Sequence, residues 1–184
     1  MKLRIALTSS IALTLAVLAA LGVHASADNR DVALRTTLRG LEEVPPIRTS
    51  ATATLRASLD ESRKTISFTL EYRNLSASPT VAHIHFGPTK VNGGVVAFFC
   101  GGGGQPACPT ATSGKITGTI SPENVVDLSA QGIPARDYDG LVYAIRTGNA
   151  YANIHNAKYP TGEIRGQIEA SGFSRAESQG SSED

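Results

Sequence analysis

The sequence lacks the motifs and charge clusters that identify several common classes of protein. The G-x-S-x-G motif of serine hydrolases and the G-x-x-x-x-G-K-[ST] phosphate loop are both absent, and the glycine run 101–104 resembles the latter only superficially. Basic residues do not cluster between aromatic ones, which excludes the usual footprint of nucleic-acid binding and a polybasic membrane patch. The 17 basic and 16 acidic residues nearly balance, which argues against a polyanionic partner.

The N-terminal segment has the features of a secretory leader. Lys2 and Arg4 precede an uncharged, mostly apolar stretch, and Ala-Ser-Ala at 25–27 forms a cleavage site. A membrane anchor is the alternative, because the stretch approaches the roughly 20 residues that span a bilayer. Small and hydroxyl-bearing residues favour cleavage. We predict a signal peptide over 1–27 and a secreted or periplasmic protein without stable membrane insertion.

The rest of the chain is long enough for one domain, predicted over residues 28–170. The segment 171–184 is rich in Ser, Gly and Glu and has a single aromatic residue, so we expect a disordered tail.

Cysteine is scarce, with Cys100 and Cys108 the only two in the chain. They bracket the glycine run, and in an oxidising compartment such a pair forms a disulfide that restrains the loop. Thiolate ligation of a metal is the alternative, and it fits an exported protein less well. We expect a structural disulfide, which for so short a loop stabilises the fold by about 2–3 kcal/mol.

Apolar and polar residues alternate with period two along most of the chain, which predicts many short strands. The segments 51–59 and 66–72, joined by the polar turn 60–64, indicate a hairpin. Only 122–131 has helical character, because it begins with Pro122 and ends before Gly132. The pattern predicts an all-β fold, an antiparallel sandwich or barrel. The other expected strands are 34–39, 81–86, 95–99, 115–120, 141–146, 150–155 and 163–170.

Three histidines lie in two of these expected strands. His83 and His85 are two residues apart, so in a strand they share one face, with Cβ atoms roughly 7 Å apart. His155 would join them from a neighbouring strand. Imidazole binds Zn or Cu, so the spacing permits a copper or zinc site. The alternative is that the rings bond to backbone carbonyls or a carboxylate at a sheet edge, and the spacing does not decide between the two.

Two acidic motifs have both a functional and a structural interpretation. If 163–168 is a strand, Glu163, Arg165 and Gln167 share a face. Glu163 would then orient a histidine through its free N–H or serve as a fourth ligand. The favoured interpretation is a solvated or self-paired strand face. Glu42 and Glu43 are adjacent, so in an extended chain their carboxylates point apart, which favours a structural role over catalysis.

Several ordered motifs together resemble the CHRD domain, named for its occurrence in chordin. They are residues 40–46 (Gly-Leu-Glu-Glu-Val-Pro-Pro), 82–88 (Ala-His-Ile-His-Phe-Gly-Pro), 93–96, 150–155 and 160–167, and the resemblance spans about 32–168. It implies an extracytoplasmic, Greek-key β-sandwich similar in architecture to copper/zinc superoxide dismutase. It implies no reaction. The loop from Cys100 to Cys108 departs from the usual pattern.

Three functions follow as hypotheses. The favoured one is a non-catalytic binding or structural module of the cell envelope, with an extracytoplasmic ligand that the sequence does not identify and no nucleic-acid partner. The second is a copper- or zinc-binding protein that uses the three histidines. A dismutase-like redox enzyme comes last, because three histidines cannot build a copper–zinc pair. We therefore do not expect an enzyme.

Overall fold

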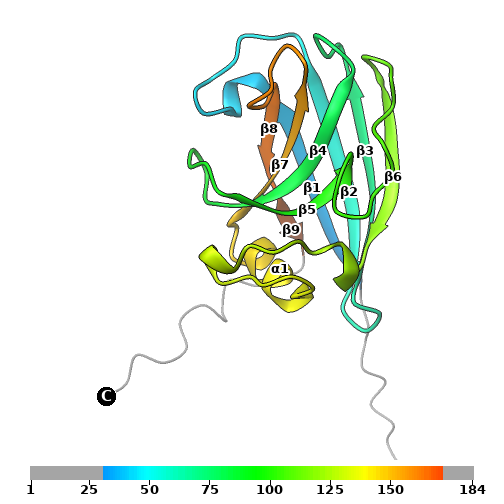
Figure 1. Cartoon of the computed structure of the whole chain (residues 1–184), viewed down its shortest axis with the longest axis vertical. Helices are drawn as coiled ribbons and strands as arrows, with labels where there is room; N and C mark the ends of the chain where they lie inside the picture. The colour runs from blue at the N-terminus through cyan, green and yellow to red at the C-terminus, as the bar shows by residue number, and fades with distance from the viewer. Residues whose placement is uncertain (1–30, 172–184) are drawn as a thin grey trace, which may run out of the picture.

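The computed structural model describes residues 31–171, so the expected leader and residues 172–184 lie outside the described part. Within it, nine strands and one α-helix form the domain (Figure 1). No helix in this part is long and apolar enough to cross a membrane. The strands are β1 (Val32–Arg39), β2 (Thr52–Asp60), β3 (Thr65–Arg73), β4 (Pro79–Phe86), β5 (Gly94–Cys100), β6 (Gly114–Ile120), β7 (Ala150–Asn156), β8 (Ile164–Gln167) and β9 (Glu169–Ser171).

All the strand pairs are antiparallel, in the order β5-β4-β7-β8-β1-β2-β3-β6, with β9 beside β1. The sheet curves over on itself and is nearly closed, so β4, β5 and β7 face β1, β2 and β3 across one core (Figure 1). The chain crosses between layers after β3 and returns so that β6 pairs with β3, which is a Greek-key connection. The all-β, sandwich-like prediction is confirmed.

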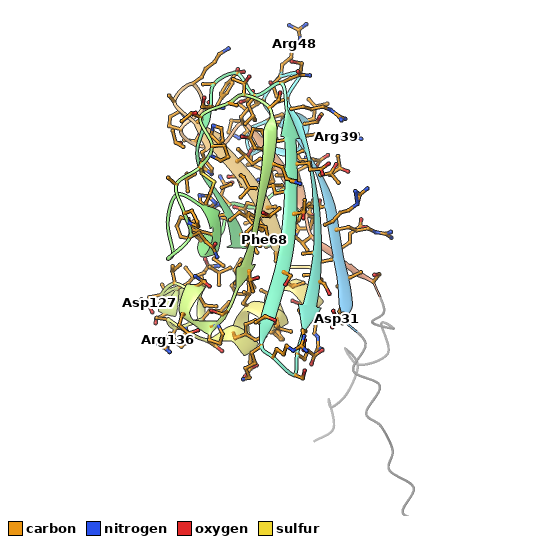
Figure 2. The ribbon with its side chains drawn as sticks, turned by 90° about the vertical axis from the view of Figure 1, so that its right-hand side faces the viewer. Asp31, Arg39, Arg48, Phe68, Asp127 and Arg136 are labelled. Carbon is orange, nitrogen blue, oxygen red and sulfur yellow. A yellow bond between two sulfur atoms is a disulfide. The ribbon has the colours of Figure 1, made fainter. Side chains whose placement is uncertain are left out.

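The β2–β3 hairpin shows how the alternating pattern specifies the sheet. Leu55 and Leu70 are paired across the two strands and buried, whereas Arg56 points outward. A shift of one residue would move every apolar side chain to the solvent face, so the pattern fixes this register. Figure 2 shows the result: Phe68 lies inside the sandwich and Arg39 on its outer side.

The helix α1 (Tyr138–Arg146) lies where a strand was expected over 141–146, so that prediction is wrong. Asp137 caps the helix by accepting a hydrogen bond from the Gly140 N–H at 2.9 Å. Its buried residues, Tyr138, Leu141, Val142, Ala144 and Ile145, follow the helical period rather than alternation.

The helix expected over 122–131 is also wrong: two short 3-10 turns, η2 (Pro122–Asn124) and η3 (Ser129–Gln131), occupy it. The Asn124 side chain accepts from the Ser121 N–H at 3.0 Å, which closes the first turn. The Val126 N–H then donates to the Val96 carbonyl in β5 at 3.0 Å. This bond to a neighbouring strand replaces the bond that would continue a helix.

The strand expected over 163–170 is divided into β8 and β9. β8 pairs with β7, whereas β9 pairs with β1 at residues 33–35. Ser171, the first residue of the expected tail, lies in β9. The division matters for the functional site, because β8 begins only at Ile164 and leaves Glu163 outside the strand.

Candidate metal centre

Three histidines meet on the outer face of the layer formed by β4 and β7. Ala82, Ile84 and Ile154 point into the core, so alternation places His83, His85 and His155 on the opposite face. β4 and β7 are hydrogen-bonded neighbours, which brings the third ring beside the other two. The His83 ring centroid lies 4.4 Å from that of His85 and 4.5 Å from that of His155.

Each histidine has one ring nitrogen that could bind a metal ion together with one from each of the other two, and these three nitrogens all lie within 4.8 Å of one another. Within residues 31–171 this is the only group of three or more metal-binding side chains with such convergence. Nitrogens that share an ion at about 2.1 Å are at most about 4.2 Å apart. In a tetrahedral site the nitrogens are about 3.4 Å apart, so the separations of up to 4.8 Å must shorten by more than about 1 Å when an ion binds, which requires the rings to move together.

Backbone carbonyls fix the tautomers of two of the rings. The Gly93 carbonyl lies 2.9 Å from His85 Nδ1, and the Pro160 carbonyl lies 2.9 Å from His155 Nδ1. A carbonyl can only accept, so each Nδ1 carries the proton and each Nε2 keeps a lone pair. This arrangement orients metal-binding histidines in many proteins.

The nitrogens left over are buried and have no hydrogen-bond partner: His83 Nδ1, His85 Nε2 and His155 Nε2. Buried polar atoms are nearly always paired, so three orphans in one cluster require a reason. A bound metal ion would satisfy all three. The residues present therefore fit the copper or zinc ion that the sequence permits.

Burial keeps the three rings neutral. It lowers the pKa of His83 to about 2, with added repulsion from His85 and His155. It also lowers the pKa of His85 to about 4 and that of His155 below its ordinary value. At neutral pH each ring is therefore neutral and keeps one nitrogen with a free lone pair, as metal binding requires.

Phe98 packs against His83, and the glycine loop packs against Phe98. The Phe98 ring meets the His83 ring edge-on, with centroids 5.4 Å apart. Gly102 and Gly103 lie against the other side of Phe98, where a Cβ on either would come within 2.6 Å of the ring. A side chain at either position would displace the ring, which explains the glycines at 102 and 103.

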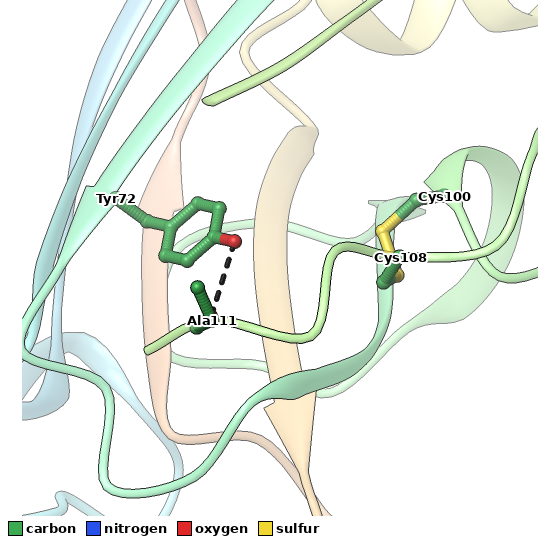
Figure 3. Close-up of a disulfide and its surroundings, with 4 residues drawn as sticks. All are labelled: Tyr72, Cys100, Cys108 and Ala111. Atoms are coloured by element: carbon green, nitrogen blue, oxygen red, sulfur yellow. Dashed lines mark hydrogen bonds between the residues drawn. A yellow bond between two sulfur atoms is a disulfide. The ribbon is translucent and has the colours of Figure 1, made fainter. Parts of the chain in front are cut away.

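The disulfide holds the ends of this loop (Figure 3). Cys100 and Cys108 are joined, with Cα atoms 5.0 Å apart, as the sequence predicted. Further along the same connection, the Tyr72 hydroxyl donates to the Ala111 carbonyl at 3.2 Å. The loop is therefore tied both to β5 and to the neighbouring layer.

Tyr151 and Arg165 border the cluster on the other side. The Tyr151 ring stacks on His85, with centroids 4.5 Å apart and planes 7° apart. The guanidinium of Arg165 lies 4.1 Å from the Tyr151 centroid. Arg165 is also paired with Glu43, Nε to Oε2 at 3.3 Å, although burial raises the pKa of this glutamate.

The solvated strand face expected at Arg165 is therefore wrong, because Arg165 is only 5% exposed and Glu43 only 2%. Glu43 was expected to have a structural role, and in the structure it forms a buried ion pair with Arg165. The two residues are 122 positions apart, so no local pattern reveals the pair. The motif 163–167 and the motif 40–46 each hold one of them.

Glu163 does not reach the histidines, which corrects the expectation that it orients or joins them. Its fully buried carboxylate accepts from Thr49 Oγ1 at 2.7 Å, from the Ser76 N–H and hydroxyl, and from Asn156 Nδ2. Asn156 and His155 are consecutive in β7 and point to opposite faces. Burial would raise the pKa of Glu163, but these hydrogen bonds outweigh it and lower the pKa.

A cavity of about 330 Å³ connects two of the histidines to the surface. His85, His155, Tyr151 and Arg165 line it, and Val44 and Pro45 also contribute. His83 is not among its lining residues. The cavity provides a route for an ion or a small ligand to reach the cluster.

The fold and the cluster define an all-β domain with a histidine site on one outer face. The CHRD domain family matches residues 34–168, about three quarters of the chain, and the chain belongs to this family. No curated protein and no solved structure matches the chain.

Proposed function

We propose that this CHRD-domain protein is a non-catalytic binding module of the cell envelope that holds one copper or zinc ion through His83, His85 and His155. The observation that carries the proposal is the convergence of three imidazole rings, each of which has a buried nitrogen without a hydrogen-bond partner. Their neutrality supports it, because an ion displaces no proton from a ring nitrogen that already has a free lone pair.

The composition of the site favours binding over redox catalysis. Three histidines supply ligands for one ion, and the carboxylate nearest in sequence, Glu163, is occupied elsewhere. The buried Glu43–Arg165 pair beside Tyr151 gives the site a fixed wall. A copper–zinc pair of the dismutase kind would need more ligands than these.

The proposal also includes the compartment in which the protein works. A disulfide is typical of exported proteins, which agrees with the leader-like N-terminal sequence. We therefore place the protein outside the cytoplasm, in the periplasm or the medium.

Calorimetric titration of the exported protein, first stripped with EDTA, tests the proposal. We expect one Cu(II) or Zn(II) per chain, bound more tightly than about 10 µM. The electron paramagnetic resonance spectrum of the copper form should show ligation by nitrogen. His83→Asn should raise the dissociation constant at least 100-fold, because it removes the ligand between the other two rings.

Glu163→Gln is the matched control, because its side chain is equally buried but bonds to Thr49 and Ser76 instead of the histidines. It should leave metal affinity within threefold of the wild type. The proposal fails if the wild type binds no ion in this range, or if His83→Asn binds as tightly as the wild type.

A further inference from the structure

Two hollows lie side by side on the outer face of the other layer, far in the topology from the histidines. One, of about 520 Å³, lies over β1, β2 and β8, and the other, of about 410 Å³, lies over β2, β3 and β6. Both are lined by Thr54, so they meet at the middle of β2. The two adjoining hollows are together called here the arginine groove.

Basic side chains dominate the arginine groove. Five line it, namely Arg35, Arg39, Arg56, Arg73 and Lys115, against three carboxylates, Glu42, Glu71 and Glu169. Glu42 is already paired with Lys90, outside the groove, at 2.9 Å. The potential along the groove is therefore positive even though the whole chain is nearly neutral.

The arginines of the groove have few acidic partners. Among residues 31–171, only Arg35 has one, Glu169 at 3.7 Å, and both side chains are more than two thirds exposed. Arg39, Arg56 and Arg73 form no ion pair with any acidic residue of this part. An exposed pair contributes little, so Arg39, Arg56 and Arg73 remain available to an anionic ligand.

Arg35 and Arg56 also lie directly opposite each other in the β1–β2 register. Like charges at directly opposite positions destabilise a sheet. An anion placed between them would remove this repulsion. Arginine suits that task because its planar guanidinium binds carboxylate or sulfate groups through two parallel hydrogen bonds.

Hydroxyl groups fill the space between the arginines. Thr37, Thr52 and Thr54 line the groove, and the amide of Gln167 lies at one end. Tyr72 is the one aromatic residue of the lining, and it is only 3% exposed. Proteins that bind single-stranded nucleic acids stack the bases on exposed aromatic side chains, which this lining does not offer, so it suits a hydroxylated, acidic chain better.

We propose that the arginine groove binds an acidic polysaccharide. Carboxylate or sulfate groups of the polymer would lie against Arg39, Arg56 and Arg73, and its sugar hydroxyls against the threonines. The groove crosses the strands of β1, β2, β3 and β6, as an extended polymer requires. This site is independent of the metal proposal, because it uses different strands and the opposite layer.

The near balance of charge in the sequence argued against a polyanionic partner, and the structure explains why that argument is weak. Near the α1 end of the molecule, three carboxylates are paired with basic residues of the same region and do not offset the charge of the groove; the pairs are Asp60–Arg63, Glu61–Arg146 and Asp139–Lys64. Figure 2 shows Asp127 at this end and Arg39 toward the other. The total charge therefore does not describe the groove, whose lining has five basic residues against three acidic ones.

Binding of the exported protein to polysaccharides of defined charge tests the proposal. The probes are polygalacturonate, which is carboxylated, dextran sulfate, which is sulfated, and uncharged dextran, in low-salt buffer with EDTA. We expect binding to at least one acidic polymer, weakening steeply with added salt, and none to dextran. The triple variant Arg39→Gln/Arg56→Gln/Arg73→Gln should raise the dissociation constant at least tenfold.

The matched control is Arg48→Gln/Arg63→Gln/Arg136→Gln, which removes the same charge from positions outside the groove. It should change the dissociation constant less than twofold. Arg56→Gln alone provides a milder test, with a smaller loss, should the triple variant fold poorly.

The proposal is overturned if neither acidic polymer binds, or if the control loses as much affinity as the groove variant. Tighter binding of single-stranded DNA than of both polysaccharides would also overturn it, in favour of a nucleic-acid surface. The EDTA keeps these outcomes separate from metal binding.

Discussion

The metal-free protein should lose stability steeply between neutral pH and pH 5, and the histidine cluster should cause most of the loss. In the folded chain the pKa is about 2 for His83 and about 4 for His85. In the unfolded chain both are near the ordinary value of about 6.5. The unfolded state therefore binds more protons in this window, so stability is complete above about pH 6.5 and falls as the pH falls.

The magnitude follows from the linkage relation. Each such group contributes about 1.4 kcal/mol per pH unit between its unfolded and folded pKa values. From pH 6.5 to pH 5 the two rings together cost about 4 kcal/mol, and His155, whose pKa is also lowered, adds to this loss. A typical domain has only about 5–15 kcal/mol in total. Glu43 opposes the trend, because its raised pKa favours folding as the pH falls.

Urea unfolding in EDTA at a series of pH values measures the effect. The midpoint should fall toward pH 5 while the slope with urea stays constant. A variant with asparagine at all three histidine positions should show less than about 1 kcal/mol of change over the same range. If this variant loses as much stability as the wild type, the neutral-cluster reasoning is refuted.

Four further substitutions probe the surroundings of the site. Glu163→Gln should lower the free energy of unfolding by about 3 kcal/mol, because charge-assisted hydrogen bonds to a buried carboxylate are lost, as urea unfolding would show. Gly162→Ala should cost at least about 2 kcal/mol by the same assay, because φ is +119° and the new Cβ would lie 2.7 Å from a buried carboxylate oxygen. Replacing Cys100 and Cys108 by alanine should cost about 2–3 kcal/mol in thermal unfolding. Phe98→Leu should weaken Zn(II) binding roughly tenfold in calorimetry by loosening His83, and unchanged affinity would show that the edge-on contact does not position that ring.

The alternation of apolar and polar residues correctly predicted those parts of the fold and the site that depend only on residues close together in the sequence. The hairpin of β2 and β3 follows from it, and so does the shared face of His83 and His85. It could not show that β7 lies beside β4, because that pairing joins segments about 70 residues apart. The sequence therefore allowed His155 to join the other two histidines, but only the pairing of β4 with β7 shows that it does.

The errors have specific physical causes. The apolar run 141–146 fits a strand and a helix equally well by composition, and the deciding signal is Asp137, an N-cap just upstream. The segment 122–131 has good helix-start residues, but its backbone bonds to β5 instead. The burial of Glu43 with Arg165 left no trace in either motif, since neither residue has an unusual neighbour in sequence.

The two carbonyls that hold the histidine rings have a consequence for the heat of metal binding. With Nδ1 of His85 and His155 bonded to Gly93 and Pro160, and all three rings already uncharged, an arriving ion releases no hydrogen ion into the medium. The enthalpy recorded near pH 7 should then be the same in phosphate-free buffers of very different ionisation heats. The protein would capture its ion equally well in a neutral or a mildly alkaline setting.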